Sequence, residues 1–223
     1  IGKSVIAIRT AIELSKSGKE VLMVDISCGK IKISEYLKVN ENIIYDVKDV
    51  LDETCSIEQS VINITDSFSI LPYPRIANKL GDIKREAFTR LIVELKKSYD
   101  IIIVDADKLS SCYFLDLNKV YSVIIINNND FSSLKEINSD CDIANKYGIE
   151  KILTVINKYN KKNANKGLML SIKDMKKMTN AEICYTLEES IKYDRIGYEF
   201  LFNNEKNSFT DGAGKIVGML NIK

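Results

Sequence analysis

The sequence predicts an α/β protein: a three-layer αβα sandwich with a mostly parallel central sheet. Four short runs rich in β-branched residues each end near a polar side chain, and their apolar character is continuous rather than alternating. Strands buried on both faces of a parallel sheet have this pattern. Amphipathic stretches lie between the runs, as in βα units with right-handed crossovers. We expect the four runs to be parallel neighbours in one sheet: residues 20–25, 101–105, 122–126 and 152–156.

Helical periodicity indicates the elements that cover this sheet. The stretch from Ser4 to Ser17 has apolar side chains over most of its surface, so we expect a mostly buried helix that Gly18 ends. Its only polar face consists of Arg9, Glu13 and Lys16. The other predicted elements are helices over 82–97, 131–147 and about 210–220, strands over 68–71 and 181–185, and an exposed Asn- and Lys-rich loop over 158–167.

Length and composition predict one large domain over residues 1–223. Hydrophobic residues make up 45% of the chain, which is typical of a globular protein with a full core. Lys and Arg number 32 against 31 Asp and Glu, so net charge makes no strong case for a nucleic-acid or membrane binder, although charge can still gather locally. No apolar run reaches the ~20 residues that span a bilayer, and no signal peptide is visible.

The residue types present exclude several kinds of active site. The chain has no His, which removes Ser-His and Cys-His hydrolase mechanisms. Its five Cys form no CxxC pair, so a zinc site would have to combine scattered Cys and carboxylates. Reduced thiols in a cytosolic protein are the simpler interpretation.

A phosphate-binding motif opens the first predicted helix. Gly2-Lys3-Ser4 matches the end of GxxxxGK[ST], a loop between a strand and a helix. In that motif, backbone N–H groups at the helix N-terminus hold phosphate, the Lys neutralises its charge and the Ser hydroxyl binds Mg²⁺. Residues Gly2 to Val5 are therefore candidates for nucleotide binding. Three motif residues alone are weak evidence, and a solvated end of the chain is the alternative interpretation.

Two carboxylates follow buried runs further along the chain. Asp25 ends the first run, and Ile101 to Asp105 has the Walker B form of four apolar residues and an Asp. Ligands of open α/β sheets bind at the carboxyl ends of strands, so we expect both acids to converge there with Lys3 and Ser4. A strand-terminal Asp can also serve only as a helix cap. The order of the three features favours a nucleotide site.

These motifs, in this order and spacing, resemble the MinD/ParA family of P-loop ATPases over nearly the whole chain. Ile1-Gly2-Lys3-Ser4 resembles the end of the family's KGGxGKS/T loop, and residues 11–25 resemble its NLAxxLAxxGxxVLLVDxD segment. Residues 95–107 resemble its helix, Tyr-Asp and Walker B passage, and Ile156-Asn157-Lys158 matches a strand-end NR/NK motif. The TadZ/CpaE pilus-localisation branch is a good fit, because its motifs are often degraded, and MinD and FlhG-type proteins are close behind it.

The resemblance implies an ATP-binding, Mg²⁺-dependent switch protein that forms an ATP-dependent homodimer and positions other cellular machinery. Lys3 would bind the β- and γ-phosphates, Ser4 would ligate Mg²⁺, and Asp105 would hold the ion through water. Asp25 would lie near the metal and the attacking water, which makes Asp25 and Lys3 the catalytic candidates. Asn157 would contact the adenine base. Such a protein is cytoplasmic, and a partner can hold it at the membrane or the cell pole.

Three departures from the family pattern bear on activity. The strand before the phosphate loop is missing. The first half of the loop is missing with it, and in the family this half carries a Lys that reaches across the dimer. Omitting a central strand exposes two strand edges, so we expect residues to precede Ile1 in the natural protein. The family's DxD segment reads Asp25-Ile26-Ser27, and its DxPxG switch reads as residues 105–109 without Gly. We therefore expect slow or absent hydrolysis, which Ser27→Asp should accelerate, with Asp107 as another source of the lost carboxylate.

Other functions and one structural alternative remain open. A nucleotide-free scaffold that recruits a partner, for example in pilus localisation, is favoured by Ser27 and the altered switch and opposed by Lys3 and Ser4. A metabolic P-loop enzyme related to dethiobiotin synthetase would share the fold but would need substrate residues that are not apparent. At the end of the chain, a helix packed on the core is favoured over a membrane-binding tail.

Overall fold

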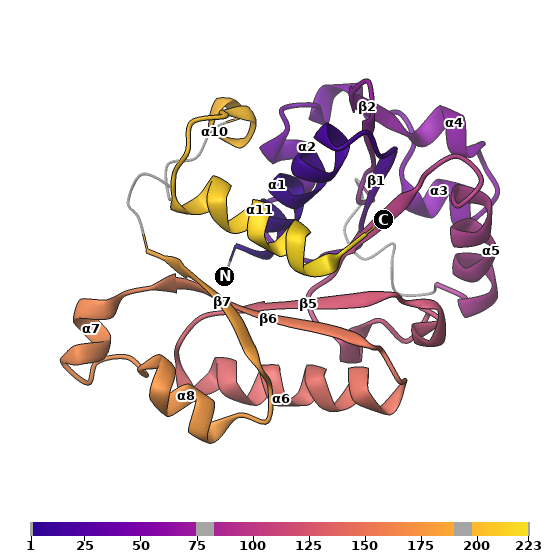
Figure 1. Ribbon diagram of the computed structural model, residues 1–223. Helices are drawn as coiled ribbons and strands as arrows, with labels where there is room; N and C mark the ends of the chain where they lie inside the picture. The colour runs from indigo at the N-terminus through magenta and orange to yellow at the C-terminus, as the bar shows by residue number, and fades with distance from the viewer. Residues whose placement is uncertain (1, 75–82, 190–197, 223) are drawn as a thin grey trace.

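The secondary structure follows the predicted alternation of strands and helices. A computed structural model describes residues 2–74, 83–189 and 198–222 (Figure 1). The described strands are β1 (Val21–Asp25), β2 (Ile62–Thr65), β3 (Phe68–Leu71), β4 (Ile101–Asp105), β5 (Ser122–Asn127), β6 (Lys151–Tyr159) and β7 (Ile183–Glu188). The longer helices are α1 (Lys3–Lys16), α5 (Arg85–Leu95), α6 (Phe131–Lys146) and α11 (Ser208–Leu220). The shorter ones are α2 (Ile33–Tyr36), η1 (Asn40–Asn42), α3 (Val47–Leu51), α4 (Ile57–Ser60), η3 (Leu109–Ser111), η4 (Leu117–Lys119), α7 (Lys161–Asn165), α8 (Ile172–Met178) and α10 (Tyr198–Phe202).

Parallel pairing dominates the strands. β1 pairs in parallel with β3 on one side and with β4 on the other, and β6 pairs in parallel with both β5 and β7. β2 is an antiparallel strand beside β3 that the sequence analysis did not predict. Its residues alternate between half-buried and exposed, which is the pattern of a strand with one solvated face. The predicted α/β fold with a mostly parallel sheet is confirmed.

Helices cover both faces of the strands, which gives three layers. Successive side chains of β1 point to opposite faces, so Met23 packs with α1 while Leu22 packs with α5. The strands β5 to β7 lie between α6 on one face and α11 on the other. Figure 1 shows α11 running between the upper and lower groups of strands. The helix α1 joins the two groups, because Ile8 packs in the core around β1 and Ile6 in the core around β6.

The strands form two sheets rather than one. The strand orders are β2-β3-β1-β4 and β5-β6-β7, so the prediction that all four apolar runs are neighbours in one sheet is wrong between β4 and β5. The first four residues of β4 are only half buried, whereas the similarly apolar β1 is buried throughout. A largely apolar cavity of about 810 Å³ is lined by β4 and β5. Protein interiors rarely contain voids much larger than a water molecule, so this space has room for a further element.

The polar face predicted for α1 is not all exposed to solvent. Arg9 is only 2% exposed, and its guanidinium donates to the main-chain oxygens of Leu201 at 2.7 Å and Asn203 at 2.9 Å. It also pairs with Glu13 one turn along the helix. The arginine therefore fastens α1 to the segment at α10, a long-range contact that helical periodicity cannot reveal.

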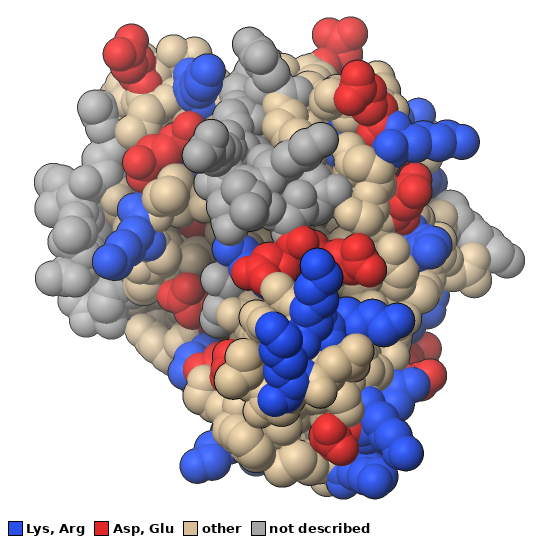
Figure 2. All heavy atoms as spheres, turned by 90° about the vertical axis from the view of Figure 1, so that its left-hand side faces the viewer, with Lys and Arg blue, Asp and Glu red and all other residues tan. Residues whose placement is uncertain are grey.

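Residues 158–167 are not the exposed loop that was predicted. β6 continues through Tyr159, and α7 follows directly, with the Asn160 side chain accepting from the Asn163 amide at 3.0 Å. Asn is a strong helix N-cap, so it starts a short helix despite the polar composition. Lys161, Lys162 and Lys166 are exposed, and Figure 2 shows Lys side chains gathered on this face with acidic side chains beside them.

The last helix, α11, packs on the core. The sequence analysis favoured this arrangement over a membrane-binding tail. Ile216 is completely buried and Leu220 is 4% exposed, in a cluster with Leu153 and Leu187. Asn207 caps the helix by accepting from the amides of the first turn. No helix in the described part of the chain is long and apolar enough to cross a membrane.

Candidate functional site

The start of α1 has a backbone conformation that requires glycine. Gly2 is the N-cap, with a φ of 89° in the left-handed region, and its oxygen accepts from the Ile6 amide at 3.1 Å. A Cβ at this position would lie 2.6 Å from Nδ2 of Asn157. The first amides of a helix have no partner within it, so this end of α1 presents N–H groups to a ligand. The Val5 side chain packs in the cores of both sheets, which leaves only its main chain for that purpose.

We predict that Gly2→Ala destabilises the protein more than Gly18→Ala. Both glycines have positive φ, at 89° and 81°, so both substitutions introduce backbone strain of about 1–3 kcal/mol. Only the change at Gly2 also forces a Cβ against Asn157, since nothing lies within 4 Å of the position at Gly18. Urea unfolding measures both losses. An equal or smaller loss at Gly2 would contradict the prediction and mean that the Asn157 side chain moves aside without cost.

Lys3, Ser4 and the two strand-end acids converge at the carboxyl edge of the first sheet. The parallel register pairs Asp25 directly with Asp105. The Ser4 hydroxyl is hydrogen-bonded to the Asp105 carboxylate, and Nζ of Lys3 donates to the main-chain oxygen of Asp107. Asn157 lies beside Gly2 at the end of β6. The structure therefore brings together every residue that the motifs selected, while their roles toward a nucleotide stay predictions.

Burial raises the pKa of both strand-end acids, Asp25 and Asp105. Asp25 is 1% exposed, and burial raises its pKa to about 7, with the neighbouring Asp105 adding to the effect. Burial also raises the pKa of Asp105, while the hydrogen bond from Ser4 opposes the shift and the charge of Asp107 reinforces it. A cation bound at this edge would favour the ionised forms of both carboxyls.

The oxygen atoms at this edge suit Mg²⁺. One oxygen of Asp105, Oδ2, is buried and has no hydrogen-bond partner among the described residues. It lies on the carboxylate that Ser4 contacts, so a hydroxyl and a carboxylate oxygen are available together. Mg²⁺ is usually held by one or two protein groups, with phosphate and water completing its octahedron. Within the described part, no group of three or more His, Cys, Asp and Glu side chains could hold a metal.

Asp25 has a structural task that the sequence analysis did not assign to it. Its Oδ1 accepts from the Ser27 amide at 3.1 Å, and its Oδ2 accepts from the Ile33 amide at 3.0 Å. The carboxylate thus holds the loop between β1 and α2 in place. Each oxygen keeps one lone pair, but Asp25 is 1% exposed, which leaves little access for the water-orienting role that the motif implies.

The loop after β1 is tied to the loop after β4. The Ser27 hydroxyl donates to Oδ1 of Asp107 at 3.0 Å, and the Cys28 amide donates to Oδ2 at 2.7 Å. On the other side, Nζ of Lys32 donates to the Ser27 oxygen at 2.6 Å and lies 3.3 Å from the centroid of the Tyr73 ring. Lys32 and Tyr73 were not predicted, because only the fold brings these distant positions together.

Buried asparagines at the end of β5 extend the polar edge. Asn127 is 1% exposed and Asn129 is completely buried, and the amide oxygens of both lack a hydrogen-bond partner within the described residues. The register pairs Asn127 with Ile156, the neighbour of Asn157. Unsatisfied buried polar atoms are rare and mark places where water or a ligand binds. The run Asn127-Asn128-Asn129 is the sequence signal that could have identified them.

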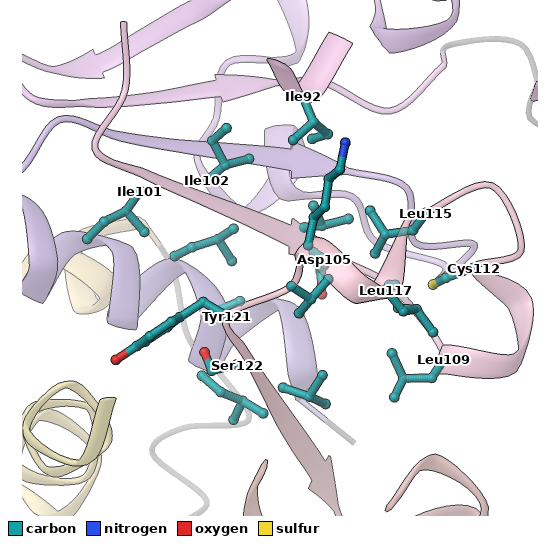
Figure 3. Close-up of a pocket in the computed structure, with 18 of the residues that line it drawn as sticks. Ile92, Ile101, Ile102, Asp105, Leu109, Cys112, Leu115, Leu117, Tyr121 and Ser122 are labelled. Atoms are coloured by element: carbon teal, nitrogen blue, oxygen red, sulfur yellow. The ribbon is translucent and has the colours of Figure 1, made fainter. Parts of the chain in front are cut away.

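The cavity between the two sheets reaches the polar site. Its lining includes Lys3, Asp105 and Asp107 together with apolar residues of β4, β5 and α1. Figure 3 shows Asp105 at the end of β4, beside apolar side chains that include Leu117. A strand in this space would therefore end close to Gly2, Lys3 and Ser4.

Asp25 should give the stability of the protein a pH dependence of the opposite sign to that of most Asp residues. Its folded-state pKa of about 7 lies above the unfolded value of about 3.9. Between these values the folded state binds more protons, so the contribution of Asp25 to the free energy of unfolding is complete below about pH 4 and is lost as pH rises to about 7. We predict that Asp25→Asn removes a fall on the order of 2–4 kcal/mol over this range.

Urea unfolding at several pH values in that range measures this effect. The matched control is Asp66→Asn, which changes an exposed carboxyl in the turn before β3, at the opposite end of the sheet from the site. Parallel pH profiles for Asp25→Asn and the wild type would contradict the prediction.

Comparison with known proteins supports the motif analysis. No protein-family model matches the sequence. The MinD protein of Synechocystis is 22% identical over 177 residues, which is 78% of this chain and 66% of that protein. The MinD protein of Helicobacter pylori is 32% identical over 108 residues, which is 48% of this chain and 40% of that protein. The matched regions thus span less than two thirds of these relatives' length.

Solved structures share the fold. The MinC:MinD complex of Aquifex aeolicus has a TM-score of 0.81 at 23% identity, covering 98% of this chain and 91% of that one. A ParA family ATPase from Chlorobium tepidum has a TM-score of 0.82 at 21% identity, covering 99% and 93%. MinD from Pyrococcus horikoshii complexed with Mg-ADP has a TM-score of 0.78 at 18% identity, also covering 99% and 93%.

The three-layer fold, with a Gly-Lys-Ser start of α1 beside a strand-end Asp, defines a protein of the P-loop NTPase class. Within that class, the chain is similar in sequence to MinD proteins and in fold to MinD and ParA family ATPases. The narrower resemblance to the pilus-localisation branch stays a prediction.

Proposed function

We propose that this protein is an ATP-binding, Mg²⁺-dependent switch of MinD/ParA type, which forms a dimer around ATP and positions other cellular machinery. The observation that carries the proposal is the meeting of Lys3, Ser4 and Asp105 at the N-terminus of α1. Lys3 would neutralise the phosphates, and Ser4 and Asp105 would hold Mg²⁺ directly and through water. Asn157 would contact the adenine base from the end of β6.

The named neighbours are compatible with this proposal. One of the similar MinD structures contains Mg-ADP, and another contains MinD together with MinC. Mg-ADP and MinC are a ligand and a partner of those proteins. They suggest a function for this chain only by analogy, because the chains share a fold. For this chain we infer a nucleotide-dependent protein partner whose identity the site residues do not specify.

We further propose that the cavity between β4 and β5 receives an apolar β-strand that leads into Gly2. Both flanking strands are parallel members of their own sheets, and each lacks a neighbour on the cavity side among the described residues. A strand inserted there would join the two sheets into one. It would also deliver the first half of the phosphate loop to the start of α1, where the motif requires it.

Hydrolysis is proposed to be slow or absent. Asp25 is bonded to two main-chain amides, and position 27 carries a hydroxyl in place of a carboxylate. The switch after Asp105 also lacks a glycine. These features favour the alternative in which the fold persists as a nucleotide-free scaffold that recruits a partner. Lys3 and the Ser4–Asp105 pair favour the nucleotide switch, because a scaffold has no need of them.

Sedimentation velocity of the natural full-length protein separates the switch from the scaffold. The switch should sediment as a dimer with Mg-ATP and as a monomer with Mg-ADP or without nucleotide. Removing Mg²⁺ with a chelator should abolish the dimer, since the ion bridges protein and phosphate oxygens. The same sedimentation coefficient under all of these conditions would refute the ATP-dependent switch and favour the scaffold.

A further inference from the structure

The sequence has no carboxylate at position 27, but the fold brings the carboxylate of Asp107 next to that position. Asp107 comes from the loop after β4, yet its Oδ1 lies 3.0 Å from the Ser27 hydroxyl oxygen. Its second oxygen accepts from the Cys28 amide at 2.7 Å, so the carboxylate is held at both ends. In addition, the main-chain oxygen of Asp107 accepts from Lys3. One residue therefore connects the loop after β1 with the phosphate-binding lysine.

The three acids at this edge differ in their exposure to solvent and ligands. Asp25 is 1% exposed and has both oxygens on main-chain amides. Asp105 is buried and is bonded to Ser4. Each oxygen of Asp107 also accepts one hydrogen bond and keeps a lone pair, but Asp107 is only half buried, so a ligand can reach it. Asp107 is thus the acid best placed to act on a ligand at this edge.

The hydrogen bond also changes what Ser27 can do. Because its proton is directed at Asp107, the hydroxyl oxygen offers only lone pairs to other groups. The Gly29 amide donates to this oxygen at 3.3 Å, which leaves one lone pair. Ser27 paired with Asp107 therefore presents an acceptor oxygen backed by negative charge, as a carboxylate at position 27 would.

We propose that Asp107 is a positioning residue of the nucleotide site, which acts through Ser27 in place of the carboxylate that position 27 lacks. This inference rests on the proposed ATP-binding function. In hydrolysis, a water oxygen bonds to the γ-phosphorus while the bond from that phosphorus to the β,γ-bridging oxygen breaks. ADP leaves with the bridging oxygen, and the protons of the water end on phosphate and in solvent. The Ser27–Asp107 pair accepts a hydrogen bond from the water and fixes its direction of attack.

The pair also revises the expectation for Ser27→Asp. That change alone would set a second carboxylate against Asp107, at about the distance where like charges prevent joint ionisation. We therefore expect it to give little or no gain in turnover while Asp107 is present. The gain should come only when the charge at 107 is removed, which makes relocation of the carboxylate the decisive test.

The experiment measures ATP turnover and ATP affinity for the natural full-length protein and four variants. Asp107→Asn and Ser27→Ala should each lower kcat about 100-fold and leave the ATP dissociation constant within about threefold, because they remove orientation rather than phosphate contacts. The Ser27→Ala/Asp107→Asn double variant should be no slower than either single variant, since the pair acts as one unit. Ser27→Asp/Asp107→Asn should recover at least ~10-fold of the loss, as the carboxylate returns to position 27.

Several outcomes would overturn the proposal. These are an unchanged kcat in Asp107→Asn, no recovery in Ser27→Asp/Asp107→Asn, and a wild type that binds ATP without turning it over. Loss of ATP affinity in Asp107→Asn equal to its loss of kcat would make the residue a ligand or a structural tie instead. Asp66→Asn serves as the matched acid far from the site and should match the wild type. Failure of the wild type to bind ATP would refute the proposed function itself, which the affinity measurement detects separately.

Discussion

Lys3→Ala is expected to weaken Mg-ATP binding by about 30–1000-fold, the largest effect of any single side chain at the site. Removing one partner of a buried, hydrogen-bonded charge pair costs about 2–4 kcal/mol, and each 1.4 kcal/mol is tenfold in affinity. Lys3 is the cation at the start of α1, and its Nζ already lies at the carboxyl edge, on the main-chain oxygen of Asp107. In the bound state that ammonium would exchange this oxygen for phosphate oxygens.

Equilibrium binding of a fluorescent ATP analogue to the natural full-length protein measures this effect. Lys146→Ala is the matched control, because it removes an exposed lysine from the last turn of α6, at the opposite edge of the sheet. Melting temperatures of both variants show whether either change unfolds the protein. Equal affinities of the Lys3→Ala protein and the wild type would mean that the start of α1 does not bind phosphate.

The second large effect concerns the cavity between the sheets. Placing the proposed strand upstream of Gly2 should raise the free energy of unfolding by ~5 kcal/mol or more. Each fully buried Val, Leu or Ile contributes about 1.5–3 kcal/mol, and the ordering of the added residues offsets part of this gain. The half-buried residues of β4 would become buried, and the two unpaired strand edges would gain hydrogen-bond partners.

Guanidinium unfolding of residues 1–223 and of the extended chain measures this gain. Binding of the dye ANS, which reports exposed apolar surface, should fall at the same time. The control is the same extension with two of its apolar residues changed to Asp, which cannot enter an apolar slot without a large desolvation cost. Equal stability of the extended chain and its Asp-containing control would show that the cavity does not take this strand.

Much of the fold could be predicted because its signals are local. The continuous apolar runs of β1, β4, β5 and β6 are each long enough to show both-face burial, and α1 is periodic over its whole length. β2 escaped prediction because a short edge strand with one wet face resembles a loop. The sequence predicted that two strand edges would be exposed, but it did not identify β4 and β5 as the two strands. Pairing between strands is a property of the whole sheet and has no local signal.

The residues of the candidate site also divide into those with a local sequence signal and those that only the fold brings together. Lys3, Ser4, Asp25 and Asp105 were found because their motifs are contiguous or end a recognisable strand. The contact between Ser27 and Asp107 joins loops 80 residues apart, and no spacing rule connects them. The hydrogen bonds from main-chain amides to Asp25 were equally hidden from sequence analysis, because they depend on how the following loop folds back over the strand end.

Calorimetric titration of Mg-ATP into the natural full-length protein tests the central claim most directly. The account predicts saturable binding of one nucleotide per chain, a large loss of affinity when Mg²⁺ is chelated, and a similar loss in Ser4→Ala, whose missing hydroxyl can no longer serve the ion beside Asp105. No saturable heat with Mg-ATP, or the same affinity with and without Mg²⁺ and in Ser4→Ala, would contradict it.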